Sequence, residues 1–455
     1  MLPMYHHQEV TAKIMAASPH TFVGNDPGTG KTRSALEAFK QLRRENKVDK
    51  LLVLAPLSIL EPAWAGDCRK WTPDLSCKVV LAKHKMRGFE EAADVYVTNH
   101  DSVKWLAKQW NPTERWAICV DEATAFKHRT SQRSKAMAAF VQHFDYRWMM
   151  TGTANSNSVL DVWHVYYLLD RGERLGRSFW GFRAQVCRPV QVGPNPNMVE
   201  WQELPHANEI VADRTKDITV RFKLEDCVDM PETVTTTMTV ELPPKLRTMY
   251  DQMQDESILA FGADEKITAV HAGVVVQKLL QICAGAIYNG EGGYKALSDN
   301  RSSLVLDLVE QRSDPVLVAF NWQHQKELLI TEATKRKISY AVIDGTVPVA
   351  DRNTYVEMFQ QGQLQVLFAH PQSAGHGLTL TRGATTIWAS PTYNAEWFQQ
   401  FNRRVYRTSQ TKRTETILIA AANTAEERVY EKLSGKLDRM TDLLTLFEKI
   451  AAQAA

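Results

Sequence analysis

The sequence lacks the features that mark membrane proteins, secreted proteins and small metal-binding domains. No apolar run approaches the ~20 residues of a membrane-spanning helix, and the N-terminus MLPMYHHQEV has no apolar core of the kind found in signal peptides. The six cysteines form no CxxC pair and fit no zinc-binding spacing. No low-complexity segment or short-period repeat occurs. We therefore expect a cytoplasmic protein with reduced thiols and no membrane partner.

A strong charge of one sign is also missing. The chain has 54 basic and 52 acidic residues, which gives a formal net charge of +2. Any contact with nucleic acid must therefore come from local basic patches and not from the charge of the whole chain. What is present is an ordinary globular composition over 455 residues, with 44% hydrophobic and 23% charged residues. At roughly 100–200 residues per domain, we expect two or three domains.

Short apolar segments alternate with helical stretches in two parts of the chain. They lie at 51–56, 94–100, 116–122 and 146–153, and again at 315–320, 340–345, 365–370, 385–390 and 415–421. Apolar strands that alternate with helices predict parallel sheets covered on both faces. The sequence therefore predicts an α/β fold with two lobes, which we divide into residues 1–225 and 226–455.

The region between the two sets has a different pattern. It includes the proline-rich QVGPNPNM, a predicted strand over 233–242 and a predicted helix over 272–285. The closing segment from Thr424 predicts a further helix, because Glu426 and Glu427 would lie in a capped, acidic first turn.

The stretch VGNDPGTGKTRSALEAF (23–39) combines glycines, a lysine and a threonine between a predicted strand and a predicted helix. Such a loop directs backbone N–H groups and a helix N-terminus at an anion. Lys31 is expected to reach the β- and γ-phosphates of ATP, and the Thr32 hydroxyl is expected to hold Mg²⁺. The nucleotide-binding residues predicted in this loop are Asp26, Pro27, Gly28, Thr29, Gly30, Lys31 and Thr32.

The loop departs from the G-x-x-x-x-G-K-[ST] pattern at one position. Asn25 stands where the pattern has glycine, and Gly24 precedes it. A glycine-rich turn that resembles a phosphate loop by chance is the alternative interpretation, so the assignment depends on the next motif.

That motif is WAICVDEA (116–123), an apolar strand that ends in two carboxylates. Asp121 is expected to hold Mg²⁺, and Glu122 is expected to act as the general base for the attacking water. The division suits hydrolysis, because the metal takes a hard oxygen ligand while the water needs a base. Together with the upstream loop, the pair predicts an ATP-hydrolysing site.

The segment TGTANS (151–156) follows another apolar strand. Thr151 and Thr153 are expected to form hydrogen bonds toward the loop of Asp121 and Glu122. A simple turn at the end of a strand is the alternative.

The segment QQFNRRVYRTSQ (399–410) carries two arginines three residues apart. This spacing predicts that Arg404 and Arg407 share one helix face. Arginine is suited to a fixed contact with phosphate, and from the second lobe the pair would act as arginine fingers on the first. A solvent-exposed basic helix face is the alternative.

In this order, the motifs resemble those of superfamily 2 helicases and most closely those of the Snf2 family of DNA translocases. The most specific match is TGTANSNSVLDVWHVYYLLDRGERLGRSFWGFR (151–183). LLVLAPLSILEPAWAGDCRKW (51–71) resembles motif Ia, and VYVTNHDSV (95–103) resembles motif Ib. DEATAFKH resembles a DEAH-type motif II, although Thr124 stands at the usual histidine.

The resemblance adds two residues to the expected ATP site. YHHQ (5–8) is similar to the adenine-recognising element and makes Gln8 its glutamine. SAGHGLTLTRG (373–383) is similar to motif V and places Gly377 at the nucleotide.

The resemblance implies two RecA-like lobes with parallel sheets and helical insertions, and an enzyme that uses ATP and Mg²⁺ to move along double-stranded DNA. Contacts with DNA would come from motifs Ia, Ib and V and from VLVAFNWQHQKELL (316–329), which is similar to motif IV, and would be mainly to backbone phosphates. We expect a compact motor of phage, plasmid or bacterial origin.

Three alternatives stay open. A strand-separating helicase would need a wedge such as a hairpin, and residues 188–230 are long enough to contain a short one. Contact with DNA is the alternative role of this segment, which is rich in proline and charge, but we expect a covering loop there. A DNA-binding or scaffold protein with an inactive ATPase is disfavoured by the intact site residues. A ring-forming AAA+ protein is disfavoured by the second α/β lobe.

Overall fold

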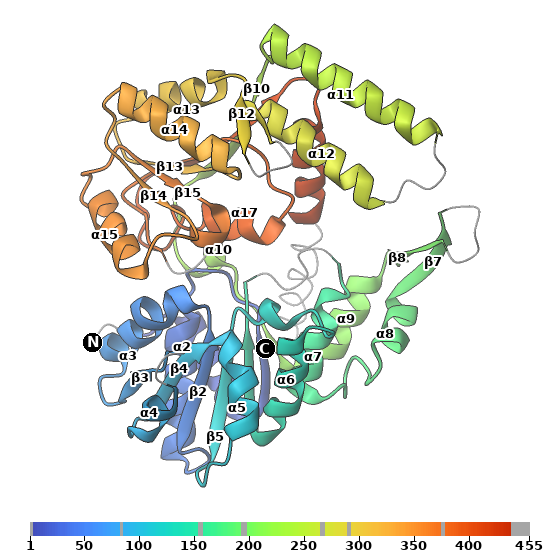
Figure 1. The fold of residues 1–455 in the computed structure, drawn as a ribbon. Helices are drawn as coiled ribbons and strands as arrows, with labels where there is room; N and C mark the ends of the chain where they lie inside the picture. The colour runs from blue at the N-terminus through green and yellow to red at the C-terminus, as the bar shows by residue number, and fades with distance from the viewer. Residues whose placement is uncertain are drawn as a thin grey trace. The chain divides into compact units, whose positions relative to one another are not determined.

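The computed structural model describes residues 3–81, 85–152, 158–192, 198–263, 269–288, 293–374 and 378–437. The chain forms two compact units, of which the first comprises Met1–Asp229 with Lys436–Ala455 and the second comprises Met230–Gly435 (Figure 1). The predicted domain boundary between residues 225 and 226 stays a prediction, because the two compact units do not show which segments fold independently.

The first unit is built on a seven-stranded sheet with the strand order β3-β4-β2-β5-β6-β1-β9. Every neighbouring pair in it is parallel. Leu52 and Leu54 of one strand lie in one hydrophobic core, while Leu51 and Val53 lie in another. The sheet is therefore buried on both faces, as the apolar segments predicted. Its strands are β1 (His20–Val23), β2 (Lys50–Ala55), β3 (Cys77–Val79), β4 (Val95–Asn99), β5 (Trp116–Asp121), β6 (Tyr146–Met150) and β9 (Thr219–Val220).

Helices pack against both faces of this sheet. Helices α1, α2 and α3 contribute to one core, and α5, α6 and α7 contribute to the other. The helices of this unit are α1 (His6–Ala17), α2 (Lys31–Arg44), α3 (Gly66–Trp71), α4 (Lys85–Glu90), α5 (Val103–Gln109), α6 (Gln132–Phe140), α7 (Asp161–Asp170), α8 (Phe179–Val186), α9 (Ala207–Thr215) and α10 (Leu224–Cys227).

The second unit has a six-stranded sheet with the order β10-β17-β16-β13-β15-β14. All its neighbouring pairs are parallel as well. The two parallel sheets confirm the predicted two-lobed α/β class. The strands are β10 (Thr233–Val240), β13 (Val316–Ala319), β14 (Tyr340–Ile343), β15 (Val366–Ala369), β16 (Thr385–Trp388) and β17 (Thr414–Ala421).

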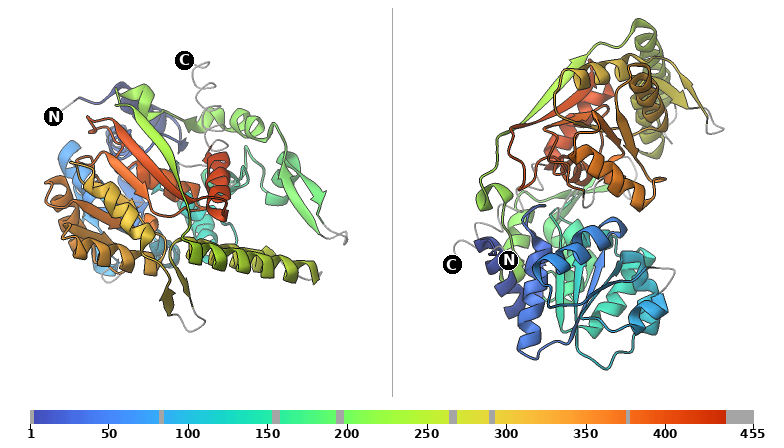
Figure 2. Two further views of the ribbon diagram at one scale, coloured as in Figure 1. Left: turned by 90° about the horizontal axis from the view of Figure 1, so that it is seen from above. Right: turned by 90° about the vertical axis from the view of Figure 1, so that its left-hand side faces the viewer.

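A helical insertion follows β10 in the second unit. Helices α11 (Pro244–Ala263) and α12 (Ala269–Cys283) pack through Leu246, Tyr250 and Leu279, and Figure 2 shows α11 as a long helix that extends beyond the sheet of this unit. The remaining elements are β11 (Ala286–Tyr288), β12 (Tyr294–Ala296), α13 (Asn300–Glu310), α14 (Gln323–Lys335), α15 (Val349–Gln360), α16 (Pro371–Ala374), α17 (Ala395–Asn402) and a helix over 425–437.

The start of this last helix agrees with the prediction from its sequence. The backbone N–H of Glu426 donates to the Thr424 hydroxyl at 3.2 Å, and Glu427 accepts from the backbone N–H of Asn423 at 2.9 Å. Among the helices within the described ranges, none is both long and apolar enough to cross a bilayer.

The segment 188–230 is not the covering loop that we expected. Strands β7 (Cys187–Gln191) and β8 (Val199–Glu203) form an antiparallel pair, and α9 and β9 follow it. Pro189 is compatible with β7 because this strand pairs on one side only, with β8. The proline-rich composition concealed the hairpin, since proline normally argues against a strand.

Candidate functional site

The predicted phosphate loop lies between β1 and α2, in the strand–loop–helix context that the sequence predicted. Gly28 and Gly30 have φ angles of 94° and 83°, which favour glycine. The conformation at Gly30 therefore favours glycine, and a methyl group there would displace the flexible end of the Gln8 side chain.

Lys31 folds over this loop. Its Nζ donates to the carbonyl oxygens of Asn25 at 2.8 Å and Asp26 at 3.2 Å. Removal from water lowers the pKa of Lys31, while the nearby carboxylates of Glu122 and Asp121 oppose that shift. The negative charges of Asp121 and Glu122 therefore act on the ammonium group of Lys31.

Asn25, the departure from the loop pattern, has a structural role. Its Oδ1 accepts from the backbone N–H of Phe222 at 2.9 Å, and its Nδ2 donates to the Thr11 hydroxyl at 3.0 Å. The side chain is 1% exposed. A glycine could make neither bond, so this position uses a side chain to join the loop to α1 and to the segment after β9.

Asp26 anchors the loop to the same segment. Its Oδ1 is 2.7 Å from Nη2 of Arg221, and its Oδ2 accepts from the backbone N–H of Leu224 at 3.1 Å. Arg221 also donates to the carbonyl of Gly24 at 2.7 Å. Both side chains of the ion pair are buried, so Asp26 and Arg221 fix the path of the loop.

Gln8 also contacts the loop directly. Its Nε2 donates to the carbonyl oxygen of Thr29 at 3.0 Å, and Nε2 of His7 lies 2.8 Å from the same oxygen. The hydroxyl of Thr29 in turn donates to the carbonyl of Asp26 at 2.8 Å. The structure therefore brings Gln8 to the phosphate loop, although its role toward adenine stays a prediction.

The two carboxylates lie at the carboxyl end of β5, where Asp121 is the last residue of the strand. Asp121 accepts two hydrogen bonds at its carboxylate, at 3.0 Å from Nε1 of Trp64 and at 3.1 Å from the backbone N–H of Glu122. Burial raises the pKa of Asp121, and the charge of Lys31 works against that rise. Glu122 has a φ of 52°, a conformation that is uncommon outside glycine.

His100, which directly follows β4, forms a hydrogen bond with the backbone of Asp121. Its Nε2 is 2.7 Å from the carbonyl oxygen of Asp121. Burial lowers the pKa of His100 to about 4, so the ring is neutral at pH 7. Since a carbonyl oxygen only accepts, Nε2 carries the proton and donates it. Asp121 is thus held at its carboxylate by Trp64 and at its backbone by His100.

The loop after β6 approaches the site as predicted. The Thr151 hydroxyl lies 3.3 Å from Oε2 of Glu122, which confirms the expected contact toward the acidic pair. A Cβ on Gly152 would come within 2.6 Å of Cδ of Pro27, so glycine is needed there as well. Thr153 lies outside the described residues.

Arg404 and Arg407 do not share a helix face, and that prediction is wrong. Helix α17 ends at Asn402, and the chain then turns so that Leu380 donates its backbone N–H to the carbonyl of Arg404 at 2.9 Å. The two guanidinium groups nevertheless converge on one atom. The carbonyl oxygen of Leu378 accepts from Nη1 of Arg404 at 3.3 Å and from Nη1 of Arg407 at 2.8 Å.

These bonds place both arginines against motif V, to which Gly377 belongs. Gly377 itself lies outside the described residues. Arg404 is buried, and its Nε also donates to the carbonyl of Gln400 at 2.7 Å. The roles of the two arginines and of Gly377 toward ATP stay predictions.

The predicted Mg²⁺ ligands are of a suitable chemical kind. One carboxylate and one hydroxyl, from Asp121 and Thr32, are what this ion takes when nucleotide phosphates supply other ligands. The raised pKa of Asp121 shows a carboxylate whose charge a bound cation would stabilise. Across the described ranges, no three His, Cys, Asp or Glu side chains are grouped as a separate metal centre.

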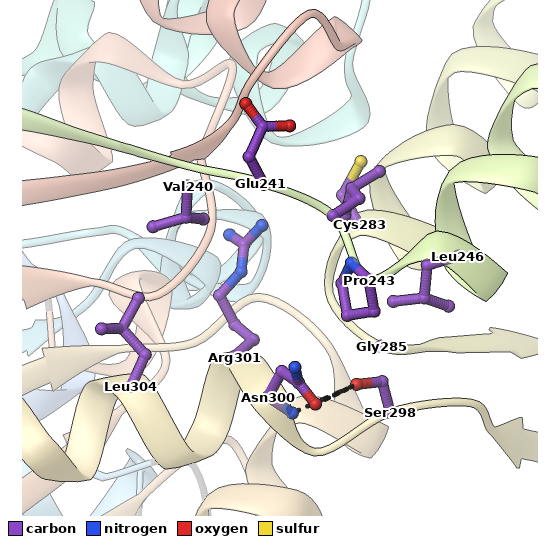
Figure 3. A pocket seen from close by; sticks show the side chains of 11 residues that line it. Val240, Glu241, Pro243, Leu246, Cys283, Gly285, Ser298, Asn300, Arg301 and Leu304 are labelled. Atoms are coloured by element: carbon purple, nitrogen blue, oxygen red, sulfur yellow. Dashed lines mark hydrogen bonds between the residues drawn. The ribbon is translucent and has the colours of Figure 1, made fainter.

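The second unit has a pocket that none of these residues lines. Its volume is about 200 Å³, and its walls include Leu242, Leu246, Cys283 and Leu304 (Figure 3). Arg301 at its wall is already paired with Glu426 at 2.8 Å. We interpret the pocket as a packing gap between α11, α12 and α13, not as part of the nucleotide site.

Three contacts of the site were missed from the sequence: those of Trp64, His100 and Arg221. Trp64 and His100 belong to the segments that resemble motifs Ia and Ib. The motifs could have indicated that Trp64 and His100 lie near the site. A motif does not, however, show which atom each side chain contacts.

Family models and known proteins are similar to this chain over most of its length. The family model "SNF2-related domain" matches residues 7–284, and "Helicase conserved C-terminal domain" matches residues 300–409. Protein p41 of Acyrthosiphon pisum secondary endosymbiont phage 1 is 29% identical over 429 residues, which are 90% of this chain and 91% of that protein.

Longer proteins match as well. An uncharacterized ATP-dependent helicase of Mycoplasma genitalium is 22% identical over 93% of this chain, but the match covers only 40% of its own length. Among solved structures, the Sulfolobus solfataricus SWI2/SNF2 ATPase core in complex with dsDNA matches with 20% identity and a TM-score of 0.46. That match covers 97% of this chain and 93% of that one.

Proposed function

The chain belongs to the SNF2-related family, and from that premise we propose that it is an ATP-driven translocase that moves along double-stranded DNA. With an SNF2-related domain and a helicase C-terminal domain, it is an ATP-hydrolysing enzyme of the helicase and translocase class. The observation that carries the proposal is that the glycine-rich loop with Lys31 follows β1 while Asp121 ends β5 and Glu122 follows it, so that both motifs lie at the carboxyl edge of the same parallel sheet. A phosphate-binding lysine beside a metal ligand and a base is what hydrolysis of a nucleoside triphosphate requires.

Each residue has a defined task in this proposal. Lys31 binds the β- and γ-phosphates, while Gly28 and Gly30 let the backbone approach them. Glu122 orients the attacking water, with Thr151 at its Oε2. Mg²⁺, held by Thr32 and Asp121, would neutralise phosphate charge. Gln8 recognises adenine. Asp26, Pro27 and Thr29 set the conformation of the loop.

The resemblance to the family assigns Arg404, Arg407 and Gly377 to the same ATP site. An arginine that reaches the transferred phosphoryl group stabilises the charge of the transition state. The two guanidinium groups share the Leu378 carbonyl, so a rearrangement of this segment would move both. DNA is bound mainly through its backbone phosphates, and the enzyme acts in the cytoplasm, where that DNA is accessible.

The test is steady-state ATP hydrolysis without nucleic acid and with single-stranded DNA, duplex DNA or RNA, at one stated salt concentration. Triplex displacement and fork unwinding are measured in parallel. Strong stimulation by duplex with triplex displacement is the expected result. Stimulation by RNA alone, or no hydrolysis under any condition, would contradict the proposal.

Four variants separate the assigned roles. Lys31→Ala is expected to abolish hydrolysis, and Glu122→Gln is expected to abolish it while ATP binding persists. Arg404→Ala and Arg407→Ala are expected to slow hydrolysis with ATP bound. Lys13→Ala, at an exposed position on α1, is the control for loss of a lysine charge. Normal turnover by Glu122→Gln would remove Glu122 as the general base.

One observation favours a second function, strand separation. The β7–β8 hairpin is an element of the kind that a wedge requires, and the sequence alone did not reveal it. Fork unwinding that is lost when residues 188–202 are replaced by a short glycine-serine linker, with ATP hydrolysis retained, would favour the helicase function over translocation alone.

A further inference from the structure

Aromatic rings and guanidinium groups alternate on the surface of the first unit beside the β7–β8 hairpin. The Arg183 guanidinium carbon lies 3.7 Å from the ring centroid of Trp201 and 4.5 Å from that of Trp180. The Arg129 guanidinium carbon lies 4.9 Å from the centroid of Trp180 and 4.7 Å from that of Phe179. We call these five residues the aromatic–arginine cluster.

The outer part of this cluster is available to a partner. Trp180 is 56% exposed, which is unusual for the largest apolar side chain. In the described part of the chain, neither Arg129 nor Arg183 forms an ion pair with a carboxylate, and Nε of Arg183 is buried without a hydrogen-bond partner. The cluster therefore offers an open indole ring and two positive charges that form no ion pair with any acidic side chain of the described residues.

The cluster is held by ordered elements. Phe182 and Val186 of α8 are buried in the core below it. Trp201 is directly opposite Pro189 in the hairpin, and Glu203 accepts the backbone N–H of Val159 at 2.8 Å. Figure 1 shows the hairpin beside α8, where it projects from the first unit. The rings are thus held by a strand and a helix. Binding of a ligand would therefore cost little entropy for ordering them.

The chemistry of the cluster fits unpaired nucleobases. An exposed aromatic face stacks on any base, and arginines beside it add attraction for phosphate and for base rings. In intact duplex DNA the base faces are covered by their neighbours, so Trp180 would gain little from it. Stacking of this kind does not distinguish one base from another, so we expect no sequence preference.

We propose that the aromatic–arginine cluster is a stacking site for unpaired bases of DNA, separate from the segments predicted to contact duplex phosphates. The proposal rests on the proposed function only in taking DNA as the polymer on which the chain acts. It places a single-strand contact at the hairpin, where a separated or frayed strand would be held.

The test uses the full chain and short single-stranded DNA that contains 2-aminopurine, whose fluorescence falls when the base stacks on an aromatic ring. Trp180→Ala is expected to weaken single-strand binding roughly tenfold, and to restore the fluorescence of the bound probe. Trp180→Phe retains a ring and is expected to retain most of the affinity. Duplex binding and duplex-stimulated ATP hydrolysis are expected to stay within about twofold of wild type, since one base-stacking contact is worth little to duplex.

Two matched controls come from the same unit. Leu81→Ala removes another exposed apolar side chain, which is 46% exposed, and is expected to change nothing. Arg188 pairs with Gln202 in the hairpin and so points away from the face of Trp201. Arg188→Ala removes one positive charge there, whereas Arg183→Lys keeps the charge and loses the planar stack. Only Arg183→Lys should lower the stacking signal.

Unchanged single-strand affinity and fluorescence in Trp180→Ala would overturn the proposal, and so would an equal loss of single-strand and duplex affinity. The outcome is independent of the test of the proposed function. Wild-type protein without duplex-stimulated hydrolysis would contradict the translocase, yet the 2-aminopurine signal would still decide the stacking site.

Discussion

Nε1 of Trp64 donates a hydrogen bond to Oδ2 of Asp121 across 3.0 Å, inside the first unit. Trp64 is 0% exposed and Asp121 is 7% exposed. The carboxylate predicted to hold Mg²⁺ is thus oriented by an indole from a segment that resembles a DNA-contacting motif. The bond therefore connects a predicted DNA-contacting segment directly to a predicted ligand of Mg²⁺.

Trp64→Phe should impair catalysis more than folding, because the ring remains while the donor is lost. A hydrogen bond to a charged group contributes about 1.5–3 kcal/mol, so we expect kcat to fall roughly tenfold or more and the Mg²⁺ requirement to rise. The measurement is ATP hydrolysis over a series of Mg²⁺ concentrations. Trp148→Phe is the matched control, since Nε1 of Trp148 donates to the carbonyl of Met15 at 3.0 Å. Equal effects of the two substitutions would contradict the orienting role.

Breaking the buried pair of Asp26 and Arg221 should unfold the first unit more readily. Removal of one partner leaves an uncompensated buried charge, which costs about 3–5 kcal/mol. Arg221→Met is therefore expected to lower the free energy of unfolding by that amount in urea denaturation. The double variant with Asp26→Asn should lose less than the sum of the two single losses. Strict additivity would show that the two side chains do not interact.

Gly30→Ala and Gly176→Ala should differ although both glycines have similar φ angles, 83° and 85°. A Cβ on Gly30 meets Gln8, whereas a Cβ on Gly176 meets no heavy atom within 4 Å. We expect Gly176→Ala to cost about 1 kcal/mol of stability from backbone strain alone. Gly30→Ala should in addition weaken ATP binding, measured with a fluorescent ATP analogue. Equal ATP affinities would show that the loop tolerates the methyl group.

Acid should destabilise the second unit through His324. This ring lies among Tyr288, Tyr294 and Trp322, and burial lowers its pKa to about 4, with Glu327 acting in the opposite direction. The unfolded state, with a pKa near 6.5, then binds the proton more readily, so stability is complete above that pH and declines as the pH falls toward 4.

The variant His324→Asn removes this titration. We expect it to lose roughly 2 kcal/mol less stability than wild type between neutral pH and about pH 5. Urea denaturation at several pH values measures the difference. Parallel curves for the two proteins would exclude His324 as a source of acid sensitivity.

Much of the fold could be predicted from sequence because its signals are local. The apolar strand 116–121 and the glycine-rich loop before Lys31 carry their information within a few residues. Parallel sheets place the carboxyl ends of strands together, so the position of Lys31 and Asp121 at the same edge of the first sheet followed from the strand–helix pattern.

The remainder depends on contacts between distant segments. Trp64 and Asp121 are 57 residues apart, and Asn25 and Phe222 are 197 apart. No spacing rule pairs them. The turn at Arg404 was missed because a helical arginine spacing cannot show that Leu378 and Leu380 capture the chain after Asn402. The hairpin was missed because cross-strand pairing overrode the local preference of Pro189.

The anchoring of the phosphate loop to Arg221, Phe222 and Leu224 has a mechanical consequence. These residues lie shortly before Met230, where the chain enters the second unit. Asn25 and Asp26 hold them through side chains that are themselves buried. The segment that leads into the second unit is therefore anchored to the glycine-rich loop by buried side chains, and a change in the path of that loop would be passed along the chain to this segment.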